Sequence, residues 1–229
     1  MPFSIGGVQK TSLLDYPGKI ACIVFSNRCN FRCGYCHNPE LITKLEPVLT
    51  VPAFFEFLNS RKGKLDGVVV TGGEPTLQKG LYDFIIQIKA LGFLVKLDTN
   101  GTNPVMIERL INDGLLDYIA MDIKAPLEKY KDITNVECST INIQKSIELI
   151  MNSKVDYEFR TTVLKSQFTF DDFDKIGKLI NGAKRYYLQK FVPSKLLDSS
   201  LIMETSYSDE EFSDILSNLS KYLTYASVR

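Results

Sequence analysis

Six apolar runs of strand length recur along the chain, and segments with helical periodicity separate them. Residues 67–71 (GVVVT) form one such run, and in residues 81–91 apolar side chains recur at helical spacing. Strands that alternate with helices favour a parallel sheet whose strands are joined by right-handed crossovers. Strands that are apolar throughout also fit a sheet covered by helices. Periodicity alone leaves two α/β architectures open, a doubly wound open sheet and an incomplete (β/α) barrel.

The 229-residue chain shows no internal repeat, no low-complexity segment and no linker rich in Gly, Ser or Pro. We therefore expect a single domain over residues 1–229, with an N-terminal extension at residues 1–19 that forms a small hairpin. Thr50 and Ser208 are expected helix N-caps, and Gly92 is an expected helix stop. The predicted strands are residues 20–25, 67–71, 93–98, 118–123, 157–163 and 185–191. The predicted helices are residues 52–60, 81–91, 104–113, 140–152, 170–180 and 209–222.

Charge and hydropathy narrow the function classes. The 27 Lys and Arg residues equal the 27 Asp and Glu residues, so no net field favours nucleic acid or an anionic membrane. No apolar run approaches the roughly 18 residues needed to span a bilayer, and residues 1–10 do not read as a signal peptide. An odd number of cysteines, five, with three of them inside eight residues, suits a metal site in a reduced compartment better than a disulfide framework. We expect a cytoplasmic protein.

Cys29, Cys33 and Cys36 have the spacing C-x3-C-x2-C. Three thiolates on one short loop can hold three irons of a 4Fe–4S cluster and leave the fourth iron open to a substrate or cofactor. The alternative is a structural zinc site in which His37, the only histidine of the chain, is the fourth ligand. The sequence assigns no role to His37 beyond this, and Cys22 and Cys138 read as a buried small hydrophobe or a spare thiol.

Polar residues follow the predicted strands at their carboxyl ends, where ligands bind in both candidate folds. The cysteines follow the first strand, and the next three groups lie at the ends of the second, third and fourth strands. The fifth and sixth strands carry the last two residues. Chance would scatter such groups over both ends of the sheet. These other groups are residues 71–75 (TGGEP), residues 98–101 (DTNG), residues 121–124 (MDIK), Arg160 and Gln189.

With an aromatic residue, Tyr35, directly before the last cysteine, the C-x3-C-x2-C loop resembles that of the radical S-adenosylmethionine enzymes. Residues 72–75 (GGEP) are similar to the second hallmark of that family, and the resemblance runs from Cys29 to Gln189. It implies a partial (β/α)6 barrel of parallel strands with outer helices. It also implies two cofactors, one 4Fe–4S cluster and S-adenosylmethionine.

A narrower resemblance concerns residues 5–13 (IGGVQKTSL), 15–19 (DYPGK) and 36–40 (CHNPE). These segments are similar to the activating proteins of anaerobic ribonucleoside-triphosphate reductase in their longer form, which are glycyl-radical-enzyme activases. The resemblance implies an oxidoreductase in which an electron from the cluster cleaves S-adenosylmethionine. The resulting 5′-deoxyadenosyl radical would take a hydrogen atom from a glycine Cα of the partner enzyme. It further implies anaerobic activity, a flavodoxin or ferredoxin as donor, and no catalytic group beyond cluster and cofactor.

The family resemblance also implies roles for the residues at the strand ends. It places a monovalent cation, bound by Asp98, Thr99, the Met121 carbonyl and Asp122, beside the cofactor carboxylate. Alternatives stay open at several positions: Tyr35 can be a packing residue, Gly72 and Gly73 a tight turn, and the two aspartates helix caps. Gln189 stands where the pyruvate formate-lyase activases have a histidine, so its role is open. The implied cofactor contacts are Tyr35, Gly72, Gly73, Glu74, Asp98, Thr99, Asp122, Lys124, Arg160 and Gln189.

Three other functions compete with this interpretation. The partner could be another glycyl-radical enzyme, such as pyruvate formate-lyase. The chain could instead act on a small molecule, as the deazaguanine synthases of similar size do. The third alternative is not an enzyme but a zinc-stabilised α/β binding module.

Overall fold

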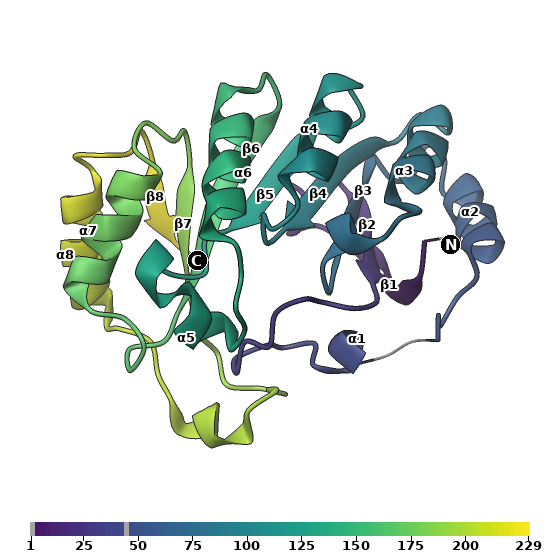
Figure 1. Cartoon of the computed structure of the whole chain (residues 1–229). Coiled ribbons are helices and arrows are strands. Elements are labelled where there is room, and N and C mark those ends of the chain that lie inside the picture. The colour runs from purple at the N-terminus through teal and green to yellow at the C-terminus, as the bar shows by residue number, and fades with distance from the viewer. Residues whose placement is uncertain (1–2, 44–45) are drawn as a thin grey trace.

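The computed structural model describes residues 3–43 and 46–229, and its centre is one sheet of eight strands that lie side by side in chain order (Figure 1). Strands β2 to β8 run parallel to one another, and β1 pairs antiparallel with β2. The strands are β1 (Ile5–Ser12), β2 (Ala21–Ser26), β3 (Gly67–Gly72), β4 (Leu94–Thr99), β5 (Tyr118–Asp122), β6 (Asp156–Val163), β7 (Tyr186–Lys190) and β8 (Ala226–Val228).

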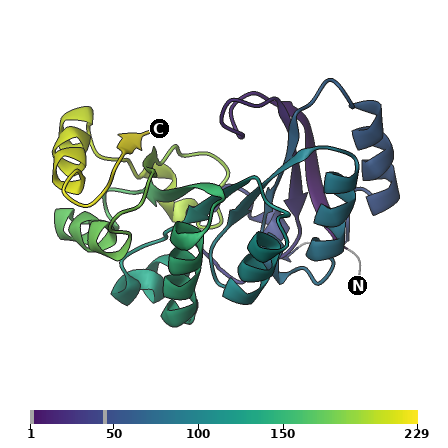
Figure 2. The same cartoon turned by 90° about the horizontal axis from the view of Figure 1, so that it is seen from above.

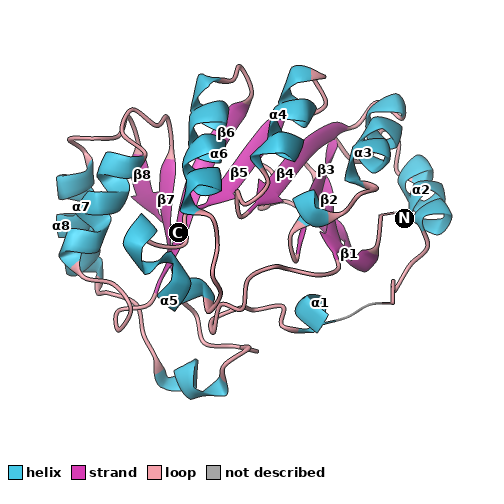
Figure 3. Ribbon diagram, viewed as in Figure 1, coloured by secondary structure: helices cyan, strands magenta, loops and turns pink. Residues whose placement is uncertain are grey.

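The longer helices cover the outer face of the sheet, and the sheet curls away from them (Figures 1 and 2). Seen from above, β1 and β8 lie at the two ends of an open curve, so the strands form a partial barrel (Figure 2). Figure 3 shows how regularly strands and helices alternate. The α-helices are α1 (Glu40–Thr43), α2 (Val51–Ser60), α3 (Leu81–Ala90), α4 (Pro104–Asn112), α5 (Tyr130–Thr134), α6 (Thr140–Asn152), α7 (Phe170–Leu179) and α8 (Asp209–Leu219).

Local sequence explains where the helices begin. The Thr50 side chain accepts a hydrogen bond from the Ala53 amide at the start of α2, as an N-cap does. Helices α7 and α8 begin with capping boxes, at Thr169 and Ser208, in which side chain and backbone bond reciprocally. Thr50 and Ser208 are the N-caps that the sequence predicts.

Alternation along the strands divides the apolar side chains between two clusters. Val68 and Val70 belong to the main core between the sheet and the helices. Val69 points to the other face of β3, where it packs in a small cluster with Tyr16, Ala21, Ile23 and Tyr118. The inside of the barrel is therefore apolar around these residues, while the polar groups described below lie toward the carboxyl ends of the strands.

The predicted α/β class and parallel sheet are confirmed, with two added strands. The predicted extension contributes β1, which pairs antiparallel with β2. β1 and β2 thus form a hairpin, and β1 is the edge strand of the sheet. The second added strand is β8, which pairs with β7. Its three residues are too few for a periodic pattern to reveal a strand. The last helix ends at Leu219, three residues before the predicted end. No helix in the described ranges is long and apolar enough to cross a membrane.

Candidate active site

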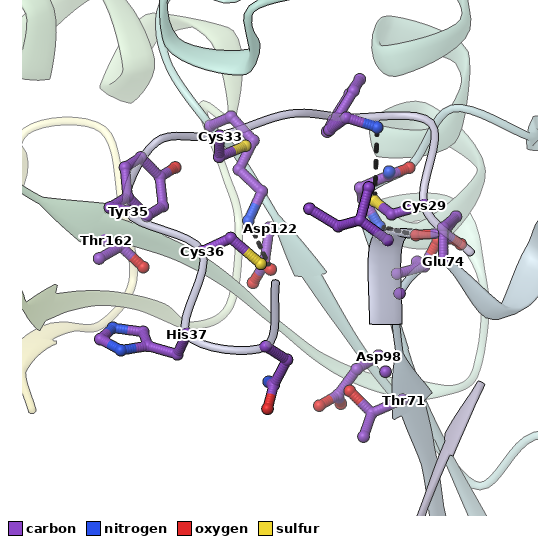
Figure 4. Close-up of a pocket in the computed structure, with 18 of the residues that line it drawn as sticks. Cys29, Cys33, Tyr35, Cys36, His37, Thr71, Glu74, Asp98, Asp122 and Thr162 are labelled. Atoms are coloured by element: carbon purple, nitrogen blue, oxygen red, sulfur yellow. Dashed lines mark hydrogen bonds and ion pairs between the residues drawn. The ribbon is translucent and has the colours of Figure 1, made fainter. Parts of the chain in front are cut away.

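A pocket opens at the carboxyl ends of strands β3 to β6, beneath the cysteine loop that follows β2 (Figure 4). Its lining includes twelve of the fourteen residues that the sequence nominates for the site. The remaining two, Met121 and Gln189, lie in β5 and β7. The twelve that line the pocket are Cys29, Cys33, Tyr35, Cys36, Gly72, Gly73, Glu74, Asp98, Thr99, Asp122, Lys124 and Arg160.

The cysteine loop is held by its own backbone and by one aromatic side chain. The Phe31 amide donates to Cys29 Sγ at 3.4 Å, and the Cys36 amide donates to the Cys33 carbonyl at 3.0 Å. The buried Phe31 ring packs edge-on against Tyr130. Burial raises the pKa of the Cys29 thiol to about 12 and also raises the pKa of Cys33. Binding iron at these sulfurs therefore has to displace protons.

The cysteines suit a cluster by their arrangement along the loop. In residues 3–43 and 46–229, no three His, Cys, Asp or Glu side chains converge as ligands of a single metal ion. A cubane requires no such convergence, because each of its cysteines binds a different iron. His37 also lines the pocket, and its Nδ1 lies 2.7 Å from Ser194 Oγ.

Gly72 and Gly73 lie against the backbone of the chain that leads into the cysteine loop. Gly72 has φ of +121°, and a Cβ there would collide with the Ser26 backbone. A Cβ on Gly73 would collide with the Arg28 carbonyl oxygen, one residue before Cys29. The Glu74 amide donates to that same oxygen at 2.8 Å. The tight-turn interpretation of the glycines is therefore correct, and their contact with the cofactor stays a prediction.

Glu74 is buried, and its carboxylate accepts four hydrogen bonds. Oε1 accepts from the Thr76 amide at 3.1 Å, from the Thr76 hydroxyl at 2.5 Å and from the Thr99 hydroxyl at 2.7 Å. Oε2 accepts from the Asn100 amide at 2.6 Å. Burial raises the pKa of Glu74, and these hydrogen bonds oppose the rise. The side chain thus joins the turn after β3 to the end of β4, a structural role that the sequence does not reveal.

Two carboxylates and three cations form a network in the wall of the pocket, and Lys96 alone among them does not line it. Asp122 Oδ1 lies 2.9 Å from Arg160 Nε, and Oδ2 lies 3.0 Å from Lys124 Nζ. Asp98 Oδ2 lies 3.4 Å from Arg160 Nη1, and Oδ1 lies 2.6 Å from Lys96 Nζ. Lys96 is the member that sequence reasoning missed. Its signal was a charged residue inside an apolar strand, two positions before Asp98 and hence on the same face.

Three members of the network, Asp122, Lys124 and Arg160, keep their charges. Burial alone would raise the pKa of Asp122, but the attraction of Arg160 and Lys124 outweighs it and lowers the pKa to about 2. Burial likewise opposes charge on Arg160 and Lys124, yet the neighbouring carboxylates raise the pKa of both. Neither aspartate is a helix cap, because Asn103 caps α4 and Pro126 precedes the next helical turn. That alternative is wrong.

Three predicted residues remain, namely Tyr35, Gln189 and Met121, and they differ in their position relative to the pocket. Tyr35 is buried with its ring 5.8 Å from Lys124 Nζ, and in the described ranges its hydroxyl has no hydrogen-bond partner. Gln189 is paired in register with Thr162, which lines the pocket although the sequence did not nominate it. Met121 is fully buried in β5 and packs toward Gly101. The roles of Gln189 and Met121 stay predictions.

A segment after β7 also contacts the cysteine loop, and nothing in the sequence signalled it. The Asp198 amide donates to the Gly34 carbonyl at 2.9 Å, and Lys195 Nζ lies 2.8 Å from Glu40 Oε2. With the Ser194 contact to His37, these bonds fix the outer side of the loop.

Comparison with known proteins decides the family, since the radical SAM superfamily matches residues 23–180, more than half of the chain. The chain belongs to the radical SAM superfamily. The predicted membership is thereby confirmed, and the family implies a 4Fe–4S cluster and S-adenosylmethionine as cofactors.

Two curated proteins and one solved structure illustrate what the chain is similar to. A Methanocaldococcus jannaschii protein, provisionally named a glycyl-radical enzyme activating enzyme, is 33% identical over 98% of this chain and 95% of its own length. The pyruvate formate-lyase-activating enzyme of Clostridium pasteurianum is 31% identical over 57% of this chain and 56% of its own. Streptococcus suis SuiB bound to its precursor peptide superposes with a TM-score of 0.68 at 13% identity, over 90% of this chain and 48% of SuiB. The chain spans about half of SuiB, and that likeness concerns the fold.

The residues of the pocket fit both cofactors that the family implies. In Figure 4 the cysteine loop arches across the pocket, with Cys29 near Glu74 and with Cys33 and Cys36 nearer Asp122. The three thiols can hold a cluster there. The cations Lys124 and Arg160 line the same pocket, so the carboxylate of an amino-acid cofactor finds partners there.

Proposed function

We propose that this chain is an activase that places a radical on a glycine of a partner enzyme, and that the partner is an anaerobic ribonucleoside-triphosphate reductase. The observation that carries the proposal is a pocket that combines Cys29, Cys33 and Cys36 with buried cations, in a chain that matches an activating enzyme over 98% of its length. The reductase as partner is supported by the resemblance of residues 5–13, 15–19 and 36–40 to its activating proteins.

When bound, the cluster and S-adenosylmethionine would supply the one-electron chemistry that removes a hydrogen atom from a glycine Cα. The chain's own residues bind and orient. Cys29, Cys33 and Cys36 would each hold one iron, which leaves the fourth for the amino and carboxylate groups of the cofactor. Lys124 and Arg160 line the pocket and would neutralise the charge of that carboxylate. The partly buried lining would limit the access of water to the reacting atoms.

Further parts of the proposal follow from the same chemistry. A cluster with an open iron oxidises readily, so we place the protein in the cytoplasm under anaerobic conditions, with flavodoxin or ferredoxin as electron donor. The monovalent cation that the resemblance implies at Asp98, Thr99, Met121 and Asp122 stays a prediction.

The test is to reconstitute the protein without oxygen, reduce it, add S-adenosylmethionine and mix it with candidate partners. We expect electron paramagnetic resonance to show a glycyl doublet with the reductase and none with pyruvate formate-lyase. The doublet should vanish in Cys33→Ala and persist in Cys22→Ala, a buried cysteine of β2 outside the pocket. A doublet with pyruvate formate-lyase alone contradicts the reductase assignment. Turnover of a pterin-like substrate without any doublet contradicts activation of a glycyl-radical enzyme.

A further inference from the structure

Lys96 occupies an unusual place for a lysine. It lies in the middle of β4, only 2% of its side chain is exposed, and its Nζ is 2.6 Å from Asp98 Oδ1. The ammonium also lies 5.9 Å from the centre of the Tyr118 ring, on the apolar side of the barrel interior. A lysine is almost never buried without a carboxylate partner, so this position is built around the pair with Asp98.

The lysine affects the groups predicted to bind a monovalent cation. All four carboxylate oxygens of Asp98 and Asp122 have a protein cation within 3.4 Å. The Thr99 hydroxyl donates to Glu74 and accepts from the Gly101 amide at 3.2 Å. Side-chain oxygens that would have to face a metal ion are therefore already turned toward partners within the chain.

The charges of the network also argue against an added metal cation. Among the groups joined by these ion pairs, three cations stand against two aspartates, so the paired groups carry one net positive charge that an incoming cofactor carboxylate can neutralise. An added monovalent cation would bring a second positive charge into a buried site. Without the Lys96 ammonium the network would be neutral, and the cofactor carboxylate would arrive uncompensated.

We propose that Lys96 is a built-in counter-ion that takes the place of the monovalent cation, so that S-adenosylmethionine binds to this chain without potassium or sodium. The inference rests on the proposed function. Lys96 does not line the pocket and acts through Asp98, so it is a positioning residue.

The experiment measures the dissociation constant of S-adenosylmethionine for the anaerobically reconstituted protein by calorimetry, in potassium chloride and in tetramethylammonium chloride of equal ionic strength. We expect less than about a twofold difference for the wild type. Lys96→Met keeps the length of the side chain and removes the charge. Since one charge-assisted interaction is worth about tenfold or more, we expect Lys96→Met to bind about tenfold more weakly in tetramethylammonium. Potassium should restore most of that loss.

Lys89→Met is the control, because Lys89 forms a lysine–aspartate pair with Asp117 at 2.7 Å, more exposed than the Lys96 pair, on residues that do not line the pocket. It should bind the cofactor like the wild type in both salts. Thallium, which replaces potassium and scatters anomalously, gives a second readout. Crystals of Lys96→Met with the cofactor should show a thallium peak between Asp98 and Asp122, and wild-type crystals should not.

A wild type that loses about tenfold in affinity without potassium overturns the inference, as does a Lys96→Met protein that binds equally in both salts. The wild-type comparison decides the matter even where Lys96→Met does not fold. Binding that depends on potassium leaves the activase proposal standing. A wild type that binds no S-adenosylmethionine in either salt refutes the activase proposal itself.

Discussion

Replacing Glu74 by Gln measures how much one buried carboxylate in the wall of the pocket contributes to the free energy of unfolding. The substitution keeps the shape of the side chain but exchanges one oxygen for a donor. In the wild type the Asn100 amide donates to Oε2 at 2.6 Å, and it loses this acceptor when the amide nitrogen of glutamine takes the place of Oε2. The three groups that donate to Oε1 then donate to a neutral oxygen in place of a charged one. A lost hydrogen bond to a charged group costs about 1.5–3 kcal/mol. Because glutamine is neutral, the variant no longer buries a charge, and this gain offsets part of that cost. The raised pKa of Glu74 indicates that burying its charge is unfavourable.

We therefore expect Glu74→Gln to lower the free energy of unfolding by about 2 kcal/mol. For a chain of this length that corresponds to a fall of roughly 4–8 °C in Tm. Urea unfolding of the cluster-free protein, followed by circular dichroism, measures the change. Glu108→Gln, on the exposed face of α4, is the control and should change stability by less than about 0.5 kcal/mol. The reasoning is refuted if both variants unfold at the same urea concentration.

Three further predictions concern the cysteines, the glycine turn and the ion-pair network. Cys33→Ala should abolish formation of 5′-deoxyadenosine and lower bound iron, while Cys138→Ala should leave both unchanged; equal turnover in the two would remove Cys33 from the ligand set. Gly73→Ala should displace the Arg28 carbonyl and reduce the iron bound on reconstitution, whereas Gly7→Ala, whose Cβ would meet its nearest neighbour at 3.5 Å, should not; iron analysis of both variants decides this. Asp122→Asn should cost about 2 kcal/mol of cluster-free stability at pH 7, because the folded pKa of about 2 lies below the ordinary value. Since a lowered pKa stabilises only above the unfolded value, this difference from the wild type should hold from pH 7 to 5 and shrink as the pH falls below about 4; a constant difference down to pH 3 would contradict it.

Elements with strong local signals could be predicted from the sequence. Residues 67–70 are apolar throughout, and a strand buried between helices and barrel interior needs that pattern. Helix α6 begins and ends at the predicted residues, because its apolar face recurs at helical spacing. The strand β8 and the short helices α1 and α5 have too few residues for any period to emerge. They depend on tertiary contacts, such as the pairing of β8 with β7.

For the site, the sequence predicts which residues take part but not which groups they bond to. Its residues could be nominated because the carboxyl ends of parallel strands meet at one edge, which brings Cys29, Asp98 and Arg160 into one pocket. What those residues bond to could not be predicted. The four hydrogen bonds of Glu74 and the collision that a side chain at Gly73 would make arise from residues far apart in the sequence. Lys96 was overlooked because a single charge in an apolar strand does not reveal its partner.

The central claim is that three cysteines leave one iron of a 4Fe–4S cluster free for S-adenosylmethionine. Electron paramagnetic resonance of the anaerobically reconstituted and reduced protein, recorded with and without the cofactor, tests it most directly. The account predicts the signal of a reduced 4Fe–4S cluster whose g-values shift when S-adenosylmethionine is added. A cluster signal that the cofactor leaves unchanged, or stoichiometric zinc in place of iron, would contradict it.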